Sequence, residues 1–303
     1  ERYLGQIASA DRQESALAEP KAKRLEDKIT ALKQEMARLK KLENRMLNAP
    51  DKQISLTDPD ARSMKTRGTG IVGYNVQTAV DTEHHLIVAH EVTNSGSDRS
   101  QLCHMAEQAR TAIDTEDLTV VADRGYFKGE EILACHEAGI TTYLPKAQTS
   151  NNKAKGLFDR DDFHYDPEAD EYRCPAGERL IRHTTTQEKG RTLYRYWSSN
   201  CQPCALKSKC TSGKERRVTR WEHEVMLEAL QARLDHDPEK MQTRRATVEH
   251  PFGTLKAWMG ATHFQTKTLK RVSTEMSLHV LAYNLKRVVN VLGVRPLIAA
   301  MAA

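Results

Sequence analysis

The sequence lacks any apolar run long enough to cross a membrane, and no signal-peptide pattern opens it. Apolar residues make up 39% of the 303 residues and charged residues 29%. We therefore expect a soluble, rather polar protein of one large or two moderate domains, with no membrane partner. The first residue is Glu rather than Met, which predicts either processing or a fragment.

Cysteine is scarce, and its placement is uneven. Four of the six cysteines lie within residues 174–210. In a chain without secretory features, such clustering favours a metal site over disulfides. The four contain one C-x2-C pair and fit a tetrahedral zinc site, although the first gap is longer than a compact zinc ribbon needs: Cys174, Cys201, Cys204 and Cys210. His183 and His223 are reserve ligands. The alternative is ordinary reduced thiols in a loop-rich segment.

The excess of positive charge is small, at +5, and permits a polyanionic partner without establishing one. Its position is more informative than its size. Six basic residues lie close together, with Glu215 as the one acid among them: Lys207, Lys209, Lys214, Arg216, Arg217 and Arg220. Such a run is commonly a solvated face, and it is also the composition of a surface that binds DNA phosphates.

A long amphipathic helix is predicted over residues 15–48. Its apolar residues are spaced 4, 3, 4, 3, 3 and 4 positions apart, close to a heptad seam: Leu25, Ile29, Leu32, Met36, Leu39, Leu42 and Met46. About three heptads fit either a coiled-coil dimer or a helical hairpin packed on its own domain.

The middle of the chain predicts an α/β fold. Residues 74–81 and 86–93 are strand-like, and their four-residue connection implies an antiparallel hairpin. A helix is expected from Ser100 to about Ile113, where Cys103 would be a packing residue. An apolar strand from Leu118, a helix over 128–139 with a packing Cys135, and a strand over 140–145 form a parallel unit with a right-handed crossover. The expected result is a mixed sheet flanked by helices.

Four segments follow from these patterns. Residues 1–50 are helical, and residues 51–146 begin the α/β domain. Residues 147–220 are a Cys-rich, basic insertion with short strands such as Arg191–Trp197. Residues 221–303 complete the domain with helices over 222–234, 239–256 and 273–292. The second of these helices is interrupted near Pro251, and the last is most simply core.

Two acids stand out, Asp123 at the end of the apolar strand and Glu249 on a predicted helix. Taken singly, Asp123 could be a turn or helix-capping residue, and Glu249 could form an i,i+4 salt bridge with Arg245. Together they provide the oxygen ligands of a site for two Mg²⁺ or Mn²⁺ ions. Arg245 and Lys256 would then contact phosphates.

Three tryptophans could stack on bases: Trp197, Trp221 and Trp258. Trp258 is the best candidate because it follows Lys256 by two residues. Packing in the core is the alternative for all three.

The motifs ADRGY at Ala122–Tyr126 and RRATVEHPFGTLK at Arg244–Lys256 resemble the DDE-type transposases of bacterial insertion sequences. The segment from Gly73 to Leu102 looks like the strands that precede the second acid in one branch of that family. The family signature of Tyr, two residues, Arg, three residues, Glu, six residues and Lys matches at Arg245, Glu249 and Lys256. Gln242 stands at the tyrosine position.

The resemblance implies an RNase H-like (retroviral-integrase-like) fold in which Asp123 and Glu249 are the second and third catalytic acids and bind Mg²⁺ or Mn²⁺. It also implies cleavage of a phosphodiester at the element ends, followed by transfer of the freed 3′-hydroxyl to target DNA. Double-stranded DNA would be the partner, a homodimer the active form, and the bacterial cytoplasm, at the nucleoid, the location.

One family element is missing from this sequence. In the family the first catalytic Asp lies on a central strand ahead of a helical stretch like residues 1–48, and no such strand precedes that stretch here. The resemblance therefore implies an N-terminally truncated chain. Local acids that could substitute are Asp58, Asp60, Asp81 and Asp98. Two other interpretations stay open, a catalytically inactive remnant that binds DNA or dimerises, and a nuclease of the same superfamily.

Overall fold

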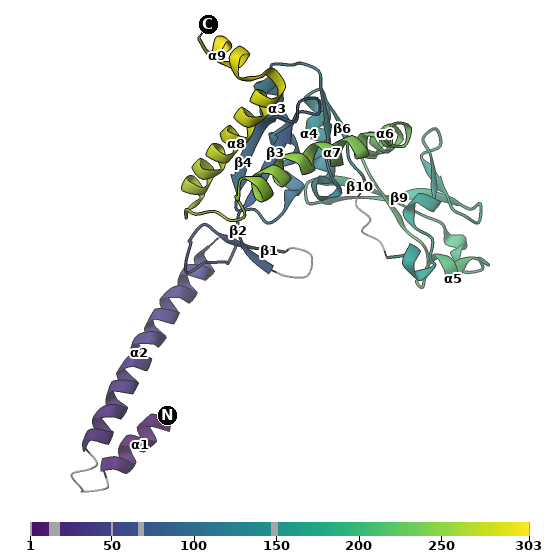
Figure 1. The fold of residues 1–303 in the computed structure, drawn as a ribbon. Helices are drawn as coiled ribbons and strands as arrows, with labels where there is room; N and C mark the ends of the chain where they lie inside the picture. The colour runs from purple at the N-terminus through teal and green to yellow at the C-terminus, as the bar shows by residue number, and fades with distance from the viewer. Residues whose placement is uncertain (1, 12–18, 50, 66–69, 147–150, 303) are drawn as a thin grey trace. The chain divides into compact units, whose positions relative to one another are not determined.

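The computed structural model describes residues 2–11, 19–49, 51–65, 70–146 and 151–302. They form two compact units. The first unit comprises Glu1–Asn75, Thr93–Gly96 and Gln265–Val272. The second comprises Val76–Val92, Ser97–Phe264 and Ser273–Ala303. The chain is thus mixed α/β, as the sequence predicts (Figure 1).

The first unit opens with helices α1 (Arg2–Asp11) and α2 (Glu19–Asn48), which pack side by side (Figure 1). The Lys28 ammonium lies 5.6 Å from the centre of the Tyr3 ring. Within the described residues the long predicted helix is confirmed and forms a helical hairpin; residues 15–18 lie outside them. The seam of α2 is only partly covered, because Leu25 is 6% exposed whereas Met36 is 69% exposed.

The rest of the first unit contains a small strand pair and the residues that contact the N-terminal end of helix α8 (Leu269–Leu292). Strands β1 (Arg62–Lys65) and β2 (Gly70–Gly73) form a small antiparallel hairpin. The carboxylate of Asp58 accepts hydrogen bonds of 3.2 Å from the backbone N–H of Thr268, immediately before helix α8. Asp60 accepts one of 2.9 Å from the N–H of Leu269. The two acids therefore satisfy N–H groups that a helix start leaves without partners.

The second unit contains the predicted strands. Strands β3 (Asn75–Val80) and β4 (Ile87–Thr93) pair across a short turn, which confirms the hairpin. Helix α3 (Leu102–Ile113) leads to β5 (Leu118–Val121), and helix α4 (Gly129–Glu137) leads to β6 (Ile140–Tyr143). Strands β5 and β6 are parallel, with Leu118 opposite Ile140, as predicted. Among the described strands, however, these two pairs form separate two-stranded sheets rather than one mixed sheet.

The core of this part lies between the parallel strands and their helices. It contains buried residues from α3, α4, β6 and helix α6 (Glu224–His236), and from the positions directly after β5 and β6: Leu102, Ala106, Ala122, Ile132, Cys135, Ile140, Leu144 and Leu230. Cys135 is fully buried and Cys103 packs against the cluster, which confirms both as packing residues. Strand β5, which ends two residues before Asp123, is therefore fixed by packing against this core.

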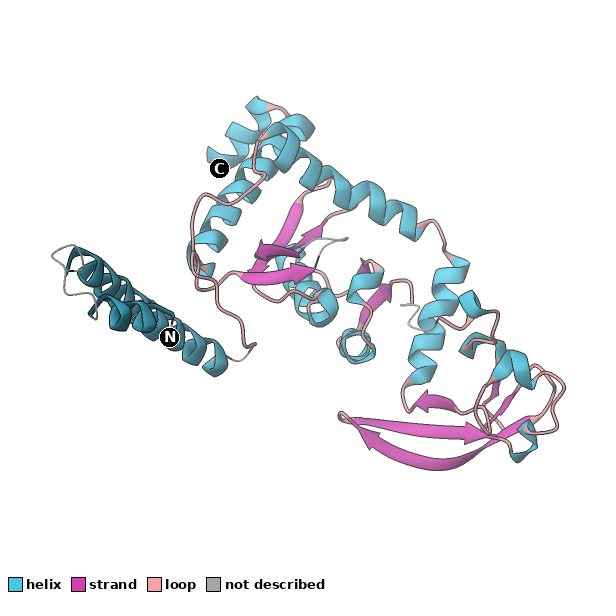
Figure 2. Cartoon of the chain, turned by 90° about the horizontal axis from the view of Figure 1, so that it is seen from below, coloured by secondary structure: helices cyan, strands magenta, loops and turns pink. Residues whose placement is uncertain are grey.

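The insertion forms a five-stranded sheet in the order β11-β10-β9-β8-β7, antiparallel throughout. Figure 2 shows the long pair of strands in this sheet in magenta. Its strands are β7 (His164–Asp166), β8 (Glu171–Arg173), β9 (Arg179–Glu188), β10 (Arg191–Trp197) and β11 (Val218–Trp221). A small core of mostly aromatic residues lies against it: Phe163, Tyr172, Leu180, Tyr196 and Val218.

The C-terminal helices follow α6. Helix α7 (Lys240–Gly253) continues into a π-helical segment, η6 (Thr254–Trp258), and helix α9 (Val294–Ala302) follows α8. Pro251 lies inside α7, and the α-helix changes to the π-helical segment two residues later, so the predicted interruption is present as a change of helix type and not as a break. Helix α8 is core on one face only, since Tyr283 is buried while Leu281 is 63% exposed. Among the described residues, no helix is long and apolar enough to span a membrane.

Candidate functional site

Asp123 lies at the carboxyl end of β5, where the apolar strand gives way to the short turn η2 (Arg124–Tyr126). Its Oδ1 accepts a hydrogen bond of 2.7 Å from the backbone N–H of Gly125. A Cβ atom at position 125 would lie 2.9 Å from that oxygen, so the carboxylate can approach this closely because residue 125 is glycine. The side chain keeps 43% of its surface exposed, which leaves it accessible to a ligand.

Helix α7 reaches this strand end through Arg244. The Arg244 Nη2 atom lies 3.0 Å from Asp123 Oδ2, and the Arg244 side chain is 26% exposed. The sequence pattern singled out the next residue, Arg245, which is exposed on the same helix. The contact with Asp123 therefore belongs to Arg244, and the prediction that Arg245 contacts phosphates stays a prediction.

Asp98 is the second carboxylate at this position. A Cβ atom at Gly125 would lie 3.5 Å from Asp98 Oδ2. The amide of Gln77, which is 1% exposed, donates a hydrogen bond of 2.8 Å to Asp98 Oδ1. The Tyr126 hydroxyl donates to the other end of the same amide. Asp98 is thus the one of the four substitute acids that the structure brings to Asp123.

Tyr126 lies within the electrostatic influence of the same groups. Burial raises the pKa of Tyr126 above its ordinary range, and the negative charges of Asp98 and Asp123 raise it further. The Arg244 guanidinium opposes this shift of the Tyr126 pKa. The hydroxyl therefore stays protonated and acts as a donor to Gln77. Sequence reasoning missed Gln77 and Tyr126 as contributors, although Gln77 stands out as a polar residue on an otherwise β-forming strand.

The three other substitute acids have structural roles. Asp58 and Asp60 receive the N–H groups at the start of α8. Asp81 accepts hydrogen bonds of 3.2 and 2.6 Å from the backbone N–H groups of Glu83 and His84, in the turn between β3 and β4. Each of these three carboxylates thus accepts hydrogen bonds from backbone N–H groups.

Glu249, Lys256 and Trp258 present exposed side chains on α7 and η6. Trp258 is 80% exposed, and the Lys286 ammonium lies 4.8 Å from the centre of its ring. Among the described residues, no three His, Cys, Asp or Glu side chains already form a group that could hold a metal ion. The contact between Arg244 and Asp123 places α7 at the strand end, but the assignment of Glu249 as a metal ligand stays a prediction.

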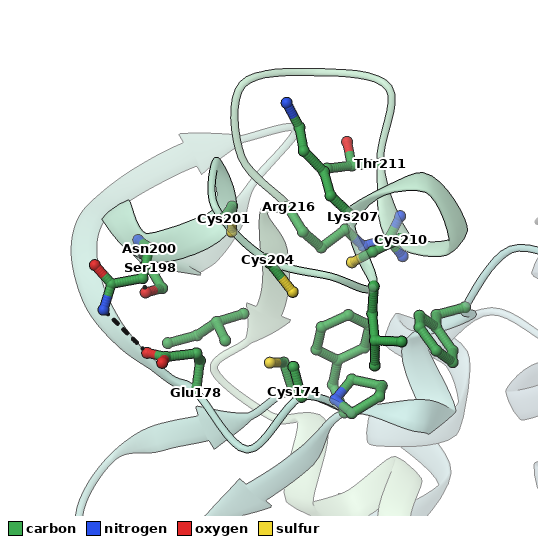
Figure 3. A pocket seen from close by; sticks show the side chains of 16 residues that line it. Cys174, Glu178, Ser198, Asn200, Cys201, Cys204, Lys207, Cys210, Thr211 and Arg216 are labelled. Carbon is green, nitrogen blue, oxygen red and sulfur yellow. Dashed lines mark hydrogen bonds between the residues drawn. The ribbon is translucent and has the colours of Figure 1, made fainter.

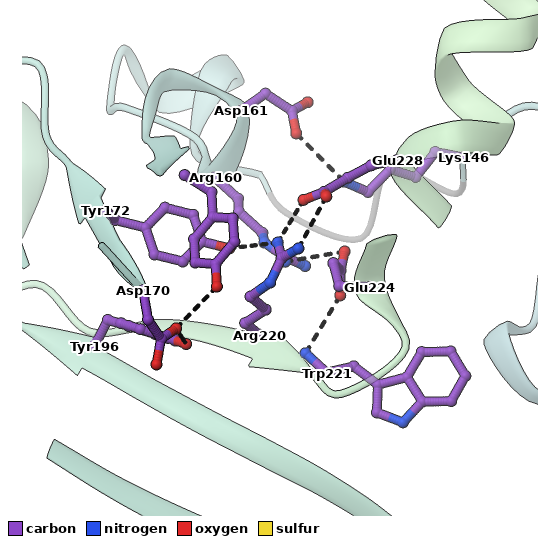
Figure 4. A network of polar contacts seen from close by, with 11 residues as sticks. Lys146, Arg160, Asp161, Asp170, Tyr172, Tyr196, Arg220, Trp221, Glu224 and Glu228 are labelled. Carbon is purple, nitrogen blue, oxygen red and sulfur yellow. Dashed lines mark hydrogen bonds and ion pairs between the residues drawn. The ribbon is translucent and has the colours of Figure 1, made fainter. Parts of the chain in front are cut away.

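The basic run of the insertion divides into buried and exposed residues. Arg220 is 4% exposed, and its guanidinium contacts Tyr172 and forms an ion pair with Glu228 (Figure 4). We therefore leave Arg220 out of any DNA-binding surface. Arg217 pairs with Glu215 but remains 56% exposed. Lys209 and Lys214 are exposed, whereas Lys207 and Arg216 are half-buried.

The other tryptophans are less accessible than Trp258. Trp221 is 6% exposed and packs so closely on α4 that a Cβ atom at Gly129 would lie 2.8 Å from its ring. Trp197 stacks on His183, with ring centres 3.9 Å apart. His183 is thereby committed to a ring contact and to a hydrogen bond of 3.1 Å with the Trp197 backbone oxygen. Trp221 is core, and Trp258 remains the accessible candidate for base stacking.

Four cysteines line one pocket of the insertion: Cys174, Cys201, Cys204 and Cys210 (Figure 3). All are free thiols. Burial raises the pKa of the Cys210 thiol, the other three thiols raise it further, and the Arg216 guanidinium opposes them. The structure therefore places the predicted set together, with Arg216 beside it.

Comparison with known families gives one match. A family model described as the transposase DDE domain matches residues 45–285, which covers Asp98, Asp123, Arg244 and Glu249. No curated protein and no solved structure matches the chain.

Proposed function

Because the chain belongs to the transposases with a DDE domain, we propose that it acts in metal-dependent cleavage and strand transfer of DNA. The observation that carries the proposal is the ion pair between Arg244 and Asp123. It connects Asp123 to the helix that also carries Glu249. Asp123 and Glu249 are 126 positions apart in the sequence. In an α/β fold, a carboxylate at the carboxyl end of a strand faces the crevice where ligands bind.

The donor chemistry fits a hard divalent cation. Asp123, Asp98 and Glu249 offer carboxylate oxygens, which Mg²⁺ and Mn²⁺ prefer. When bound, such ions would supply an activated attacking oxygen and stabilise the leaving oxygen. Asp123 and Glu249 are proposed as ligands, and Asp98 as the neighbouring acid that the buried Gln77 amide orients. Hydrolysis then breaks one P–O bond of DNA and frees a 3′-hydroxyl, which attacks a phosphodiester of the target.

DNA would be held by the exposed basic and aromatic side chains. Lys256 and Trp258 lie on the segment after α7, where one offers a charge for a phosphate and the other a flat face for a base. Arg245, Lys209 and Arg217 are further phosphate contacts, each with an exposed side chain. Lys207 and Arg216 are half-buried, so they contribute less to phosphate binding. Binding of this kind is sensitive to salt.

The active form is proposed to be a homodimer. The part of the α2 seam beyond Leu25 supports this, because Leu32, Met36 and Leu39 are 49%, 69% and 54% exposed. Apolar residues at this spacing suit the packing of one helix against another.

A second candidate is an inactive remnant that binds DNA without cutting it. It is favoured by the absence, among the described residues, of a group of three or more ligands ready to hold a metal. The remnant predicts salt-dependent DNA binding and no nicking in either Mg²⁺ or Mn²⁺.

The test is a nicking assay on supercoiled plasmid DNA with Mg²⁺ or Mn²⁺. The proposal expects nicking by the wild-type chain and its loss in Asp123→Asn and Glu249→Gln, with DNA binding retained. Asp161→Asn is the matched control, because Asp161 is 62% exposed and lies on the insertion. Nicking that persists in both acid variants would reject the assignment of these residues. Binding without nicking by the wild type would favour the remnant, and release of cut ends without joining would favour a nuclease.

A further inference from the structure

Three segments of the insertion bring their cysteines to one small space. Cys174 follows β8, Cys201 and Cys204 follow β10, and Cys210 ends the short helix α5 (Lys207–Cys210). The space between them has a volume of about 30 Å³ and is otherwise lined mainly by apolar side chains such as Phe163 and Leu180. Figure 3 shows the sulfurs of Cys174 and Cys204 pointing toward the same space.

Backbone hydrogen bonds fix the turns that carry these thiols. The N–H of Gly177 donates to the carbonyl of Cys174 at 2.8 Å, and the N–H of Cys174 donates to the carbonyl of Glu178 at 3.0 Å. Gly177 has a φ of +86°, which closes this Cys-Pro-Ala-Gly turn. On the other side, the N–H of Lys207 donates to the carbonyl of Cys204 at 3.1 Å. Two tight turns therefore carry thiols that line the same pocket.

Arg216 is one of three charged residues that line this pocket, with Glu178 and Lys207. Its guanidinium carbon lies 5.4 Å from the centre of the Phe163 ring, and the side chain lines the pocket with the cysteines. Among the described side chains, its Nε is buried and has no hydrogen-bond partner. A buried N–H without an acceptor is costly, so an acceptor is expected here. Thiolate sulfurs bound to a cation would provide one.

We propose that Cys174, Cys201, Cys204 and Cys210 bind one Zn²⁺ and that Arg216 is the positioning residue that offsets the negative charge of the four thiolates. Zn²⁺ is the cation that four thiolates including a C-x2-C pair favour. The side chains do not already stand as a ligand set, so binding requires rotation of the cysteine side chains toward the cavity. The Arg216 Nε–H then donates to a thiolate, as groups around metal ligands commonly do.

A structural metal would also stabilise the insertion, which buries little apolar surface. The insertion has a small core of five buried residues, and most of β9 is exposed. Small segments with so little buried apolar surface commonly depend on a metal or a disulfide. All six cysteines are free thiols, so the four in this pocket are available as ligands. Zinc would then hold Lys209 and Arg217 in place without touching DNA itself.

The test measures zinc per chain by elemental mass spectrometry, using full-length protein purified under reducing conditions. Co²⁺ exchanged for the zinc provides a second readout, the thiolate-to-cobalt absorption band. We expect about one zinc per wild-type chain, a thiolate band with Co²⁺, and loss of both in the double variant Cys201→Ser/Cys204→Ser. Cys103→Ser is the matched control and should keep both. A folded wild-type chain that binds neither Zn²⁺ nor Co²⁺, or that contains a Cys201–Cys204 disulfide instead, would overturn the proposal.

The role of Arg216 is tested separately from the metal site. Arg216→Gln removes the charge and should weaken zinc binding about 10-fold in competition with a chelator. Arg217→Gln is the control, because Arg217 is exposed and pairs with Glu215. Zinc affinity unchanged in Arg216→Gln would remove Arg216 from the site while leaving the four ligands in place. Because these readouts do not involve cleavage, they are independent of the nicking assay.

Discussion

Arg244 of helix α7 donates a hydrogen bond of 3.0 Å to the carboxylate of Asp123 at the end of strand β5. The same carboxylate accepts the Gly125 N–H through its other oxygen, so both oxygens are engaged. A metal that bound Asp123 would have to share this carboxylate with the guanidinium. The ion pair therefore both places α7 beside the strand end and competes with a cation for the acid.

This competition predicts the effect of removing the charge. Arg244→Gln should tighten Mn²⁺ binding by up to about fivefold, because a partly exposed ion pair is worth up to about 1 kcal/mol. The measurement is a Mn²⁺ titration followed by electron paramagnetic resonance. Arg245→Gln is the control and should change the affinity less, since Arg245 is exposed and makes no described contact with Asp123. Weaker Mn²⁺ binding in Arg244→Gln would show that Arg244 orients Asp123 rather than competing for it.

Gln77 is expected to be the most sensitive polar residue beside the site. Its buried amide donates to Asp98 and accepts from the Tyr126 hydroxyl, so Gln77→Leu leaves both partners without that contact. Unfolding in urea should show a loss of about 1–3 kcal/mol. Gln187→Leu is the control, because Gln187 is exposed and bonds only to Thr192 among the described contacts. Equal stability of the two variants would contradict this role.

Asp58 predicts a dependence of stability on pH. Burial acts to raise the pKa of Asp58, but hydrogen bonds from Tyr74 and the backbone outweigh it, and the pKa is lowered from the usual 3.8. A carboxyl with a lowered folded pKa stabilises the fold above its usual pKa, and loses this effect as the pH falls through the folded value. Asp58→Asn should therefore cost about 1 kcal/mol at neutral pH.

The control for the Asp58→Asn variant is a comparison of its unfolding free energy with that of the wild type at several pH values. The difference in unfolding free energy between wild type and Asp58→Asn should shrink as the pH falls below the usual value of 3.8. A difference that stays constant between neutral and acidic pH would show that the charge of Asp58 contributes nothing. The exposed Asp161→Asn variant should track the wild type at neutral pH.

Arg220 and Arg217 should separate stability from DNA binding. Arg220→Met removes a buried guanidinium that contacts Glu228 and Tyr172, and should lower the free energy of unfolding by about 1–3 kcal/mol. Arg217→Met should change stability by less than about 0.5 kcal/mol but weaken DNA binding and flatten its salt dependence. Urea unfolding and fluorescence anisotropy with labelled duplex measure the two effects. Equal DNA affinities of the two variants would contradict this division.

The sequence predicts the helices and strands better than it predicts which of them pack against each other. The apolar runs gave β5 and β6 and their parallel pairing, and strand β10 was predicted with its observed bounds, Arg191–Trp197. The heptad spacing gave α2, but it could not say whether another chain covers its exposed residues. Pro251 predicted an interruption, which the structure shows as a change from α-helix to π-helix after Gly253.

The site was predicted in part, for a physical reason. An acid at a strand end and an Arg–Glu pair on a helix can be recognised from local spacing. The choice between Arg244 and Arg245 depends on how α7 is rotated against β5, which local spacing does not contain. The approach of Asp98 to Gly125 likewise depends on the turn before α3 meeting the turn after β5, which lie about 25 positions apart in the sequence. Burial of Arg220 follows from the five-stranded sheet, which the short polar strands did not reveal.

The most direct test of the account is Mn²⁺ binding by the full chain, measured by electron paramagnetic resonance in the wild type, Asp123→Asn, Glu249→Gln and the control Asp161→Asn. The account predicts that both acid variants lose at least about 10-fold in Mn²⁺ affinity while the control equals the wild type. Equal affinity in the wild type and both acid variants would contradict the claim that Asp123 and Glu249 share one metal centre.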